Sequence, residues 1–343
     1  MAKYLSVCSG IEAVSVSWKS LGWKPVGFSE IEKFPCEVLK HHYPSVPNLG
    51  DMTNYKEWQI EKPDIIIGGT PCQSFSIAGL RKGLEDPRGN LTLTFIGLLD
   101  HFKPTWFVWE NVPGVLSNNK GRDFHTFIEG LQEIGYSLSW RVLDAQFFGV
   151  PQRRKRVFVV GHRSADWRYS YKALFESESL SGYLEKSRNK GSTRQATTKS
   201  TESIKRNDWP KQISNTLDAH FGDKMGLEDQ HINSGCPRFV PTTVYENHGT
   251  DSRVKPLGKV CTTVTARWGT GGNNTPLVGN SRIRRLSPIE CERLQGFPDD
   301  YTNIKGDKTP YGARYKALGN SMAVPVIEWI GRGIQKVEEY SNG

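Results

Sequence analysis

Short apolar runs alternate with helix-like stretches through the first half of the chain. Runs rich in branched or aromatic residues predict strands at 4–7, 26–28, 64–67, 106–109, 138–143 and 157–160. Between the first two, Val14, Trp18 and Leu21 recur at helical spacing. This alternation predicts an α/β fold, a mostly parallel, doubly wound sheet with helices on both faces. Ligands of such sheets bind at the carboxyl ends of the strands.

The regular pattern stops near residue 163 and resumes near residue 284. Between residues 163 and 282 the sequence has 18 Lys or Arg and 12 Asp or Glu, so this segment carries +6 of the net charge of +9. Glycine, threonine and asparagine dominate residues 262–277, where no periodicity is left. An isolated basic stretch is usually a solvated linker, but this long segment predicts a separate, smaller and irregular module.

Two helices are predicted after the irregular segment. Ser287-Pro288-Ile289-Glu290 has the residues of a capping box with proline at the first helical position. The stretch after Gly319-Asn320-Ser321 places Ile327, Ile330, Ile334 and Val337 on one stripe. We therefore predict an α/β domain at 1–162, an inserted module at 163–282 and a segment at 283–343 that returns to the first domain.

Composition limits the classes of protein that fit this pattern. With 36% hydrophobic and 24% charged residues and no long apolar segment, the chain is predicted to be neither membrane-spanning nor disordered. The six cysteines form no Cys-x-x-Cys pair, which argues against zinc-ribbon and redox motifs and predicts no metal site. Reduced thiols and the lack of a signal peptide predict a cytoplasmic protein. The basic excess permits a polyanionic partner.

A candidate nucleophile follows the third predicted strand, in Gly68-Gly69-Thr70-Pro71-Cys72. A lone cysteine is more often a small buried side chain than a nucleophile. Here Pro71 fixes the backbone before the thiol, the glycines permit a ligand to approach, and the position is a strand's carboxyl end. We therefore predict that Cys72 is a nucleophile, activated as a thiolate by an electropositive site. The polar, glycine-rich residues 73–90 predict a lid over it.

Two further strands carry polar groups that suit a binding site. Glu110 ends the fourth predicted strand, where a carboxylate is as often a cap or ion-pair partner as a functional group. A buried glutamate can stay protonated and donate to a ring nitrogen. Arg154 and Arg156 alternate onto one face at the start of the sixth strand, where guanidinium groups suit a phosphate or a carbonyl oxygen.

Taken in order, these stretches resemble the DNA cytosine methyltransferases that modify carbon 5. Pro71-Cys72-Gln73 is similar to the family's nucleophile motif, Glu110-Asn111-Val112 to its Glu-Asn-Val motif and Gln152-x-Arg154-x-Arg156 to its Gln-x-Arg-x-Arg motif. Further similar stretches are Arg285-Leu286-Ser287 with Glu290 and Arg293, Gln295-Gly296-Phe297-Pro298, and Gly319-Asn320-Ser321 with Pro325. The resemblance runs from Tyr4 to about Gly331 except for the irregular segment, and it implies the fold of S-adenosylmethionine-dependent methyltransferases.

The resemblance implies a sequence-specific enzyme that transfers the methyl group of S-adenosylmethionine to carbon 5 of cytosine in duplex DNA. Cys72 would add to carbon 6 of a cytosine that is flipped out of the helix. Glu110 would hold or protonate the ring nitrogen, Arg156 would reach the ring oxygen, and Arg154 would contact the neighbouring backbone.

The resemblance also implies a cofactor pocket. It places Ser9 and Gly10 near the methionine portion, Glu30 at the ribose hydroxyls and Asp51 at the adenine amine. Pro71, Leu91, Asn320 and Ser321 would complete the pocket. Where the family usually has a Gly-x-Gly-Gly turn, this chain reads Ser9-Gly10-Ile11-Glu12-Ala13. S-adenosylmethionine has no pyrophosphate, so the close backbone approach that dinucleotides need is less necessary.

Double-stranded DNA is the implied partner, with a cognate restriction endonuclease as a further one, and a monomer suits an enzyme that surrounds a duplex. The module at 163–282 would be the target-recognition domain, with the basic run 186–211 on phosphates and the loops around Arg267 reading base edges. Further DNA contacts are expected from the lid and the arginine motif, at Ser76, Arg81, Arg88 and Gln152.

Three alternatives stay open at the level of sequence. RNA cytosine methylation could use the same scaffold, although the long basic module favours DNA. A catalytically silent DNA-binding regulator would need the loss of a catalytic residue, and Cys72, Glu110, Arg154 and Arg156 are all present. A nicotinamide oxidoreductase fits least well, because the glycine fingerprint after the first strand is incomplete.

Overall fold

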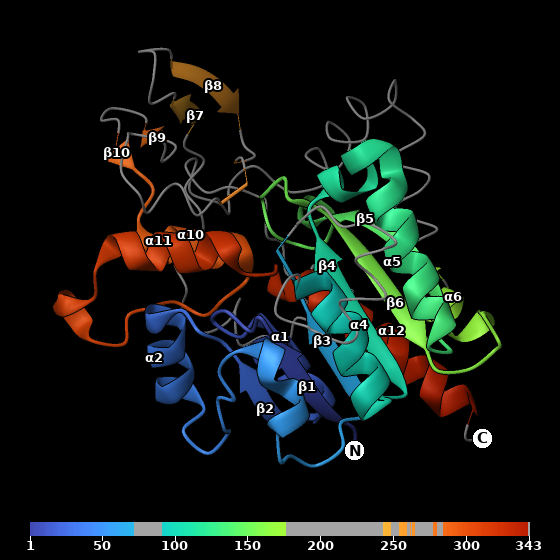
Figure 1. Cartoon of the computed structure of the whole chain (residues 1–343). Coiled ribbons are helices and arrows are strands. Elements are labelled where there is room, and N and C mark those ends of the chain that lie inside the picture. The colour runs from blue at the N-terminus through green and yellow to red at the C-terminus, as the bar shows by residue number, and fades with distance from the viewer. Residues whose placement is uncertain are drawn as a thin grey trace.

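The structure, a computed structural model, describes residues 1–71, 91–175, 243–247, 254–258, 261, 263–264, 277–279 and 284–341. Within this part, an α/β domain lies beside a second, smaller sheet and a helical lobe (Figure 1). Several predicted residues lie outside the described part of the chain, namely Cys72, Ser76, Arg81, Arg88 and Arg267.

All six predicted strands form, and they belong to one six-stranded sheet. Their bounds are β1 Lys3–Val7, β2 Lys24–Ser29, β3 Ile65–Gly68, β4 Trp106–Asn111, β5 Ser137–Asp144 and β6 Lys155–His162. The strand order is β2-β1-β3-β4-β6-β5, in which β6 runs antiparallel to both its neighbours and the other pairs are parallel. The predicted mostly parallel, doubly wound sheet is therefore confirmed.

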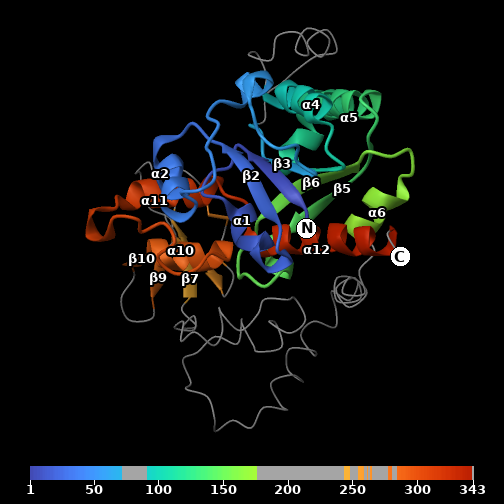
Figure 2. The ribbon, with the colours of Figure 1, turned by 90° about the horizontal axis from the view of Figure 1, so that it is seen from below.

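Helices cover both faces of this sheet, as Figure 2 shows. On one face lie α1 Ala13–Trp18, α6 Arg168–Phe175 and α12 Val324–Ser341. On the other lie α4 Leu91–Phe102 and α5 Arg122–Glu133. The stripe predicted on the last helix is buried in the first of these layers, because Ile327, Ile330 and Ile334 are 0% exposed. Both faces of the central strands are thus covered, which explains their continuous apolar sequences.

A second sheet lies in the segment where only an irregular module was predicted. It has four antiparallel strands in the order β10-β9-β7-β8. Their bounds are β7 Thr243–Asn247, β8 Val254–Gly258, β9 Leu277–Gly279 and β10 Arg284–Arg285. These strands were not predicted individually, because strands this short leave no recognisable alternation in the sequence. Since β10 pairs with β9, this sheet continues past the predicted boundary at residue 282.

A helical lobe connects the small sheet to the large domain. The first of its helices, α10 Pro288–Gln295, begins at the predicted capping box, in which Ser287 and Glu290 bond each other's backbone. The second, α11 Tyr311–Asn320, packs against α10 and against α2 Lys33–His42 of the large domain. A core that includes Ile11, Leu294 and Leu318 joins the lobe to the end of β1. Among the described helices, none is both long enough and apolar enough to cross a membrane.

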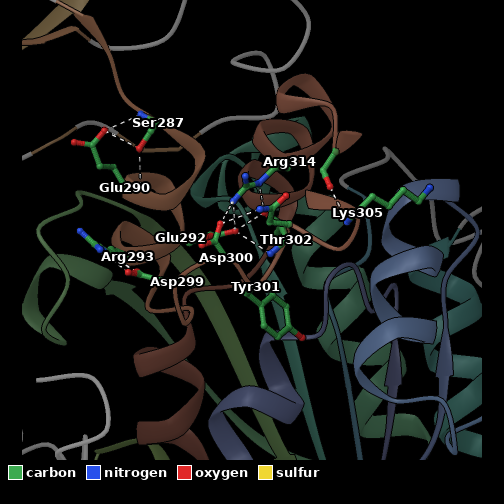
Figure 3. A network of polar contacts seen from close by, with 12 residues as sticks. Ser287, Glu290, Glu292, Arg293, Asp299, Asp300, Tyr301, Thr302, Lys305 and Arg314 are labelled. Carbon is green, nitrogen blue, oxygen red and sulfur yellow. Dashed lines mark hydrogen bonds and ion pairs between the residues drawn. The ribbon is translucent and has the colours of Figure 1, made fainter. Parts of the chain in front are cut away.

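A buried ion pair holds the lobe together (Figure 3). Glu292 is 0% exposed, and its Oε1 accepts from Arg314 Nη2 at 2.9 Å and from the Thr302 backbone N–H at 2.8 Å. The Thr302 hydroxyl also donates to Glu292 and accepts from Arg314 Nε at 2.8 Å. This network fixes the segment that connects α10 to α11. It thereby fixes the position of the end of α10 and of the beginning of α11.

Replacing Arg314 by leucine should lower the free energy of unfolding by about 3–5 kcal/mol, because the Glu292 carboxylate would stay buried without its cation. The matched control is Arg293→Leu, which removes an ion pair with Asp299 whose side chains are 19% and 30% exposed, and it should cost about 1 kcal/mol. Urea denaturation measures both losses. Equal losses in the two variants would contradict the structural role given to the buried pair.

Candidate functional site

Glu110 lies against the loop that leads into Cys72. A Cβ atom built on Gly69 would be 3.0 Å from Glu110 Oε2 and 3.3 Å from Met322 Cε, so a side chain at this position would crowd the carboxylate. Gly69, the first residue after β3, therefore permits the Glu110 carboxylate to lie close to the backbone, and the predicted approach of a ligand stays a prediction. The carboxyl ends of β3 and β4, which are neighbours in the sheet, bring the two segments together.

Hydrogen bonds from β4 fix the backbone just before Cys72. Trp109 Nε1 donates to Thr70 Oγ1 at 2.9 Å, and Asn111 Nδ2 donates to the Thr70 carbonyl at 3.0 Å. Thr70 is buried, whereas Pro71, the next residue, is exposed. The chain thus leaves the core at Pro71 and continues directly into Cys72.

Glu110 carries the electrostatic features of a proton donor. Its Oε1 lies 3.1 Å from Arg156 Nε, and the side chains of Glu110 and Arg156 are only 12% and 16% exposed. Burial raises the pKa of the Glu110 carboxyl above its ordinary value, and the positive charges of Arg154 and Arg156 partly oppose that rise. Such a carboxyl can hold a proton that an exposed glutamate would lose.

Arg154 is enclosed by backbone carbonyls of distant segments. Its Nη1 donates to the Val264 carbonyl at 3.1 Å, and its Nη2 donates to Gly319 O at 3.2 Å and to Ser321 O at 2.6 Å. Burial lowers the pKa of Arg154 to about 9. The structure thus gives Arg154 a role in positioning the turn before α12, and its predicted contact with the backbone that neighbours the target base stays a prediction.

Gln152 also contacts Val264, and it joins this residue to α10. Its side chain is 0% exposed, its Nε2 donates to Leu294 O at 2.8 Å, and its Oε1 accepts from the Val264 backbone N–H at 2.7 Å. Gln295 Nε2 continues the chain of contacts by donating to Leu318 O at 2.7 Å. The predicted contact of Gln152 with DNA stays a prediction, because its side-chain amide is hydrogen-bonded to Leu294 and Val264 of the protein itself.

The predicted cofactor residues at the ends of β1 and β2 do come together. The Ser9 backbone N–H donates to Ser29 O at 3.1 Å, and Ser9 Oγ accepts from the Ser29 N–H at 3.1 Å. The Gly10 N–H donates to Glu30 Oε2 at 2.8 Å. One side of Gly10 is open, since a Cβ atom built there would have no heavy atom within 4 Å. We call residues 9–12 the cofactor turn.

The acidic residues beside this turn fit a nucleoside. Glu30 Oε1 accepts from the backbone N–H groups of Ile31 at 2.8 Å and Glu32 at 2.7 Å, which fixes the carboxylate while lone pairs remain for ribose hydroxyls. Asp51 caps the helical turn after it by accepting from the Thr53 N–H at 2.9 Å. These carboxylates can hold S-adenosylmethionine through its hydroxyl and amine donors.

The remaining predicted cofactor residues lie on or beside other helices of the fold. Leu91 is the first residue of α4, Asn320 is exposed at the end of α11, and Ser321 is buried. Tyr301, which was not predicted as a site residue, donates its Oη–H to the Ile11 carbonyl in the cofactor turn at 2.9 Å. No sequence signal marks a tyrosine that reaches a turn so far away in the chain. Among the described residues, no cluster of His, Cys, Asp or Glu could hold a metal ion.

Comparison with known proteins shows which family this chain resembles. The family described as C-5 cytosine-specific DNA methylase matches residues 2–336. Type II methyltransferase M.NgoBI of Neisseria gonorrhoeae is 31% identical, with 96% of this chain and 91% of that protein covered. Type II methyltransferase M.Bsp6I of Bacillus sp. (strain RFL6) is 29% identical, with 98% and 99% covered.

One relative has a different name. An Escherichia phage P1 protein named DNA N-6-adenine-methyltransferase is 33% identical over 97% of this chain, but this chain spans only 61% of that protein. A large part of the phage protein therefore lies outside the match. Among solved structures, S. pombe Dnmt2 has a TM-score of 0.60 at 17% identity, with 100% of both chains covered, which is a likeness of fold.

These matches confirm the sequence-based predictions of the methyltransferase fold, of a DNA cytosine-5 methyltransferase and of S-adenosylmethionine as the methyl donor. The relatives named as type II methyltransferases also agree with a link to restriction and modification. Since the family match leaves out only the first residue and the last few, this chain belongs to the C-5 cytosine-specific DNA methylase family.

Proposed function

We propose that the chain methylates carbon 5 of one cytosine in a specific duplex DNA sequence, through a bond between Cys72 and carbon 6. The observation that carries this proposal is the mostly buried Glu110, 3.1 Å from Arg156 and against Gly69, on the strand beside the one that leads into Cys72. A thiol and a proton-holding carboxyl on adjacent strand ends suit attack on a ring carbon with proton donation to a ring nitrogen.

In the first step, the Cys72 thiolate forms the bond to carbon 6. The electron pair of the ring's double bond shifts toward carbon 5 and the ring nitrogen, where Glu110 delivers its proton, while Arg156 holds the ring oxygen. S-adenosylmethionine, when bound, would supply the methyl group to carbon 5, with its methyl–sulfur bond breaking and S-adenosylhomocysteine as the leaving group. Water then removes the proton from carbon 5, the double bond forms again, Cys72 leaves as a thiolate, and Glu110 regains its proton.

The DNA must be deformed for this chemistry, because carbon 6 is inaccessible inside a duplex and the nucleotide has to be flipped out. In the proposed enzyme, residues 73–90, with Ser76, Arg81 and Arg88, close behind the flipped base. Residues 163–282 form the target-recognition domain, with Arg267 near the bases. The enzyme acts as a monomer and protects DNA from a cognate endonuclease.

Nucleoside analysis tests this function directly. The purified chain is incubated with labelled S-adenosylmethionine and duplex DNA, and the hydrolysed DNA is examined by mass spectrometry. We expect label in 5-methylcytosine. Label in N6-methyladenine would overturn the proposed reaction and favour the activity in the phage relative's name, and label in tRNA but not in DNA would overturn the proposed substrate. Bisulfite sequencing of the product then gives the recognition sequence.

A further inference from the structure

A buried glutamate lies in the cofactor turn, and the proposed mechanism does not use it. Glu12 is 0% exposed, and its φ of 65° is in the left-handed region that side chains other than glycine rarely adopt. Its Oε2 is buried without a hydrogen-bond partner in the described part of the chain. A glutamate here costs both backbone strain and desolvation, which glycine would avoid.

The contacts of Glu12 link the cofactor turn to the first helix. Its backbone N–H donates to the Ser9 carbonyl at 3.0 Å, which closes the turn around Gly10. Its Oε1 accepts from the Ser15 backbone N–H at 3.1 Å and from Ser15 Oγ at 3.1 Å. The Glu12 backbone thus closes the turn, while its side chain caps α1, which packs on the sheet, and so holds this end of the turn against the helix.

Tyrosines surround this carboxylate. Tyr4 Oη lies 2.7 Å from Ser15 Oγ, and Tyr43 Oη lies 3.3 Å from Tyr301 Oη, whose proton is donated to the Ile11 carbonyl. The charge of Glu12 acts on all three tyrosines, and Glu30 is the acidic neighbour that acts on Glu12. Burial raises the pKa of Glu12 to about 7, and the polar side chain of Ser6 and the hydrogen bonds from Ser15 oppose that rise.

We propose that Glu12 is a positioning residue for S-adenosylmethionine, which holds the cofactor turn in its binding shape and whose negative charge strengthens binding of this cationic cofactor. The inference rests on the proposed placement of the cofactor at Ser9 and Gly10. The sulfonium and ammonium groups of the cofactor are favoured by a fixed negative charge in a region of low dielectric constant. Protonation of the carboxyl removes that charge.

Calorimetric binding of S-adenosylmethionine tests the proposal without any methyl transfer. The wild-type chain should bind it about three- to tenfold more tightly at about pH 8 than at about pH 6, because Glu12 ionises between them. S-adenosylhomocysteine, which lacks the sulfonium charge, should show a smaller step. In Glu12→Gln the step due to Glu12 should be absent and the affinity should resemble that of the protonated wild type. The cofactor's own amine titrates in the same way with both proteins, so the difference between wild type and Glu12→Gln reports Glu12 alone.

Two further variants distinguish the effect of the Glu12 carboxylate on binding from the effect of its backbone conformation and from the effect of losing any one negative charge. Glu12→Gly accepts the positive φ without strain but lacks the carboxylate. It should therefore show the cooperative thermal unfolding of a folded protein and bind S-adenosylmethionine about tenfold more weakly. Glu61→Gln removes a carboxylate that is 69% exposed in an ion pair with Lys3, and its binding should match wild type.

The outcomes are distinguishable from one another. Unchanged affinity in both Glu12 variants would overturn the role of Glu12. If a variant fails to fold, the wild type decides: equal pH steps for S-adenosylmethionine and S-adenosylhomocysteine, which carry the same amine, would also overturn it. A wild-type chain that bound no S-adenosylmethionine would instead overturn the proposed cofactor turn. Binding without methyl transfer would overturn only the proposed function.

Discussion

Replacing Cys72 by serine should reduce methyl transfer to duplex DNA by about 10³-fold or more. A serine hydroxyl is hardly ionised at neutral pH, and the attack on carbon 6 needs the electron pair of an anion. Transfer of a labelled methyl group to DNA measures the loss. Since Glu110, Arg156 and the cofactor turn would be intact, binding of S-adenosylmethionine should stay at the wild-type level.

The same substitution should remove the covalent adduct. When carbon 5 of the target carries fluorine, the last step cannot finish, because a base would have to remove fluorine as a cation. The Cys72 bond to carbon 6 then remains, and the complex survives denaturing electrophoresis. Cys36→Ser is the matched control and should still form the adduct, since Cys36 Sγ donates to the Glu30 carbonyl at 3.3 Å, away from Glu110. A Cys72→Ser protein with full activity would contradict the assignment of the nucleophile.

The large sheet was predictable because burial on both faces leaves a strong signal in the sequence. Ile65-Ile66-Ile67 forms the middle of the sheet, with each of these side chains at most 1% exposed. The capping box at Ser287 also encodes a local geometry, since its residues bond each other's backbone. The small sheet could not be found in this way, because the pairing of β9 with β10 joins short segments through contacts that periodicity does not report.

Within the site, residue types were easier to predict than residue roles. Alternation along β6 indicated which side chains share a face, but it does not say which carbonyls come within reach. Arg154 contacts the carbonyl of Val264, which is 110 positions away in the sequence. It also contacts those of Gly319 and Ser321, which are 165 and 167 positions away. The unusual position of Glu12 was visible in the sequence, since it stands where the family usually has a glycine turn. The structure shows that Glu12 adopts the left-handed backbone conformation that glycine adopts easily.

Replacing Glu110 by glutamine should lower the turnover rate of methyl transfer by about 10²- to 10⁴-fold, the usual contribution of a general acid. Glutamine has nearly the same shape and can hydrogen-bond the ring nitrogen, but it cannot transfer a proton. The negative charge that develops on the ring after attack by Cys72 would then stay unneutralised. Single-turnover transfer of labelled methyl groups, with saturating DNA, measures the loss of the chemical step.

The pH profile of the wild-type chain should carry the signature of Glu110. Because burial raises its pKa, the proton-donating form persists to a higher pH than in an exposed glutamate, and the rate should fall as pH rises through that raised pKa. The contribution of Glu110 to stability has the same sign, since it is present at low pH and is lost as pH rises through the folded-state pKa. In Glu110→Gln both of these pH-dependent losses should be absent, and a variant that kept the wild-type alkaline fall in rate would show that another group supplies the proton.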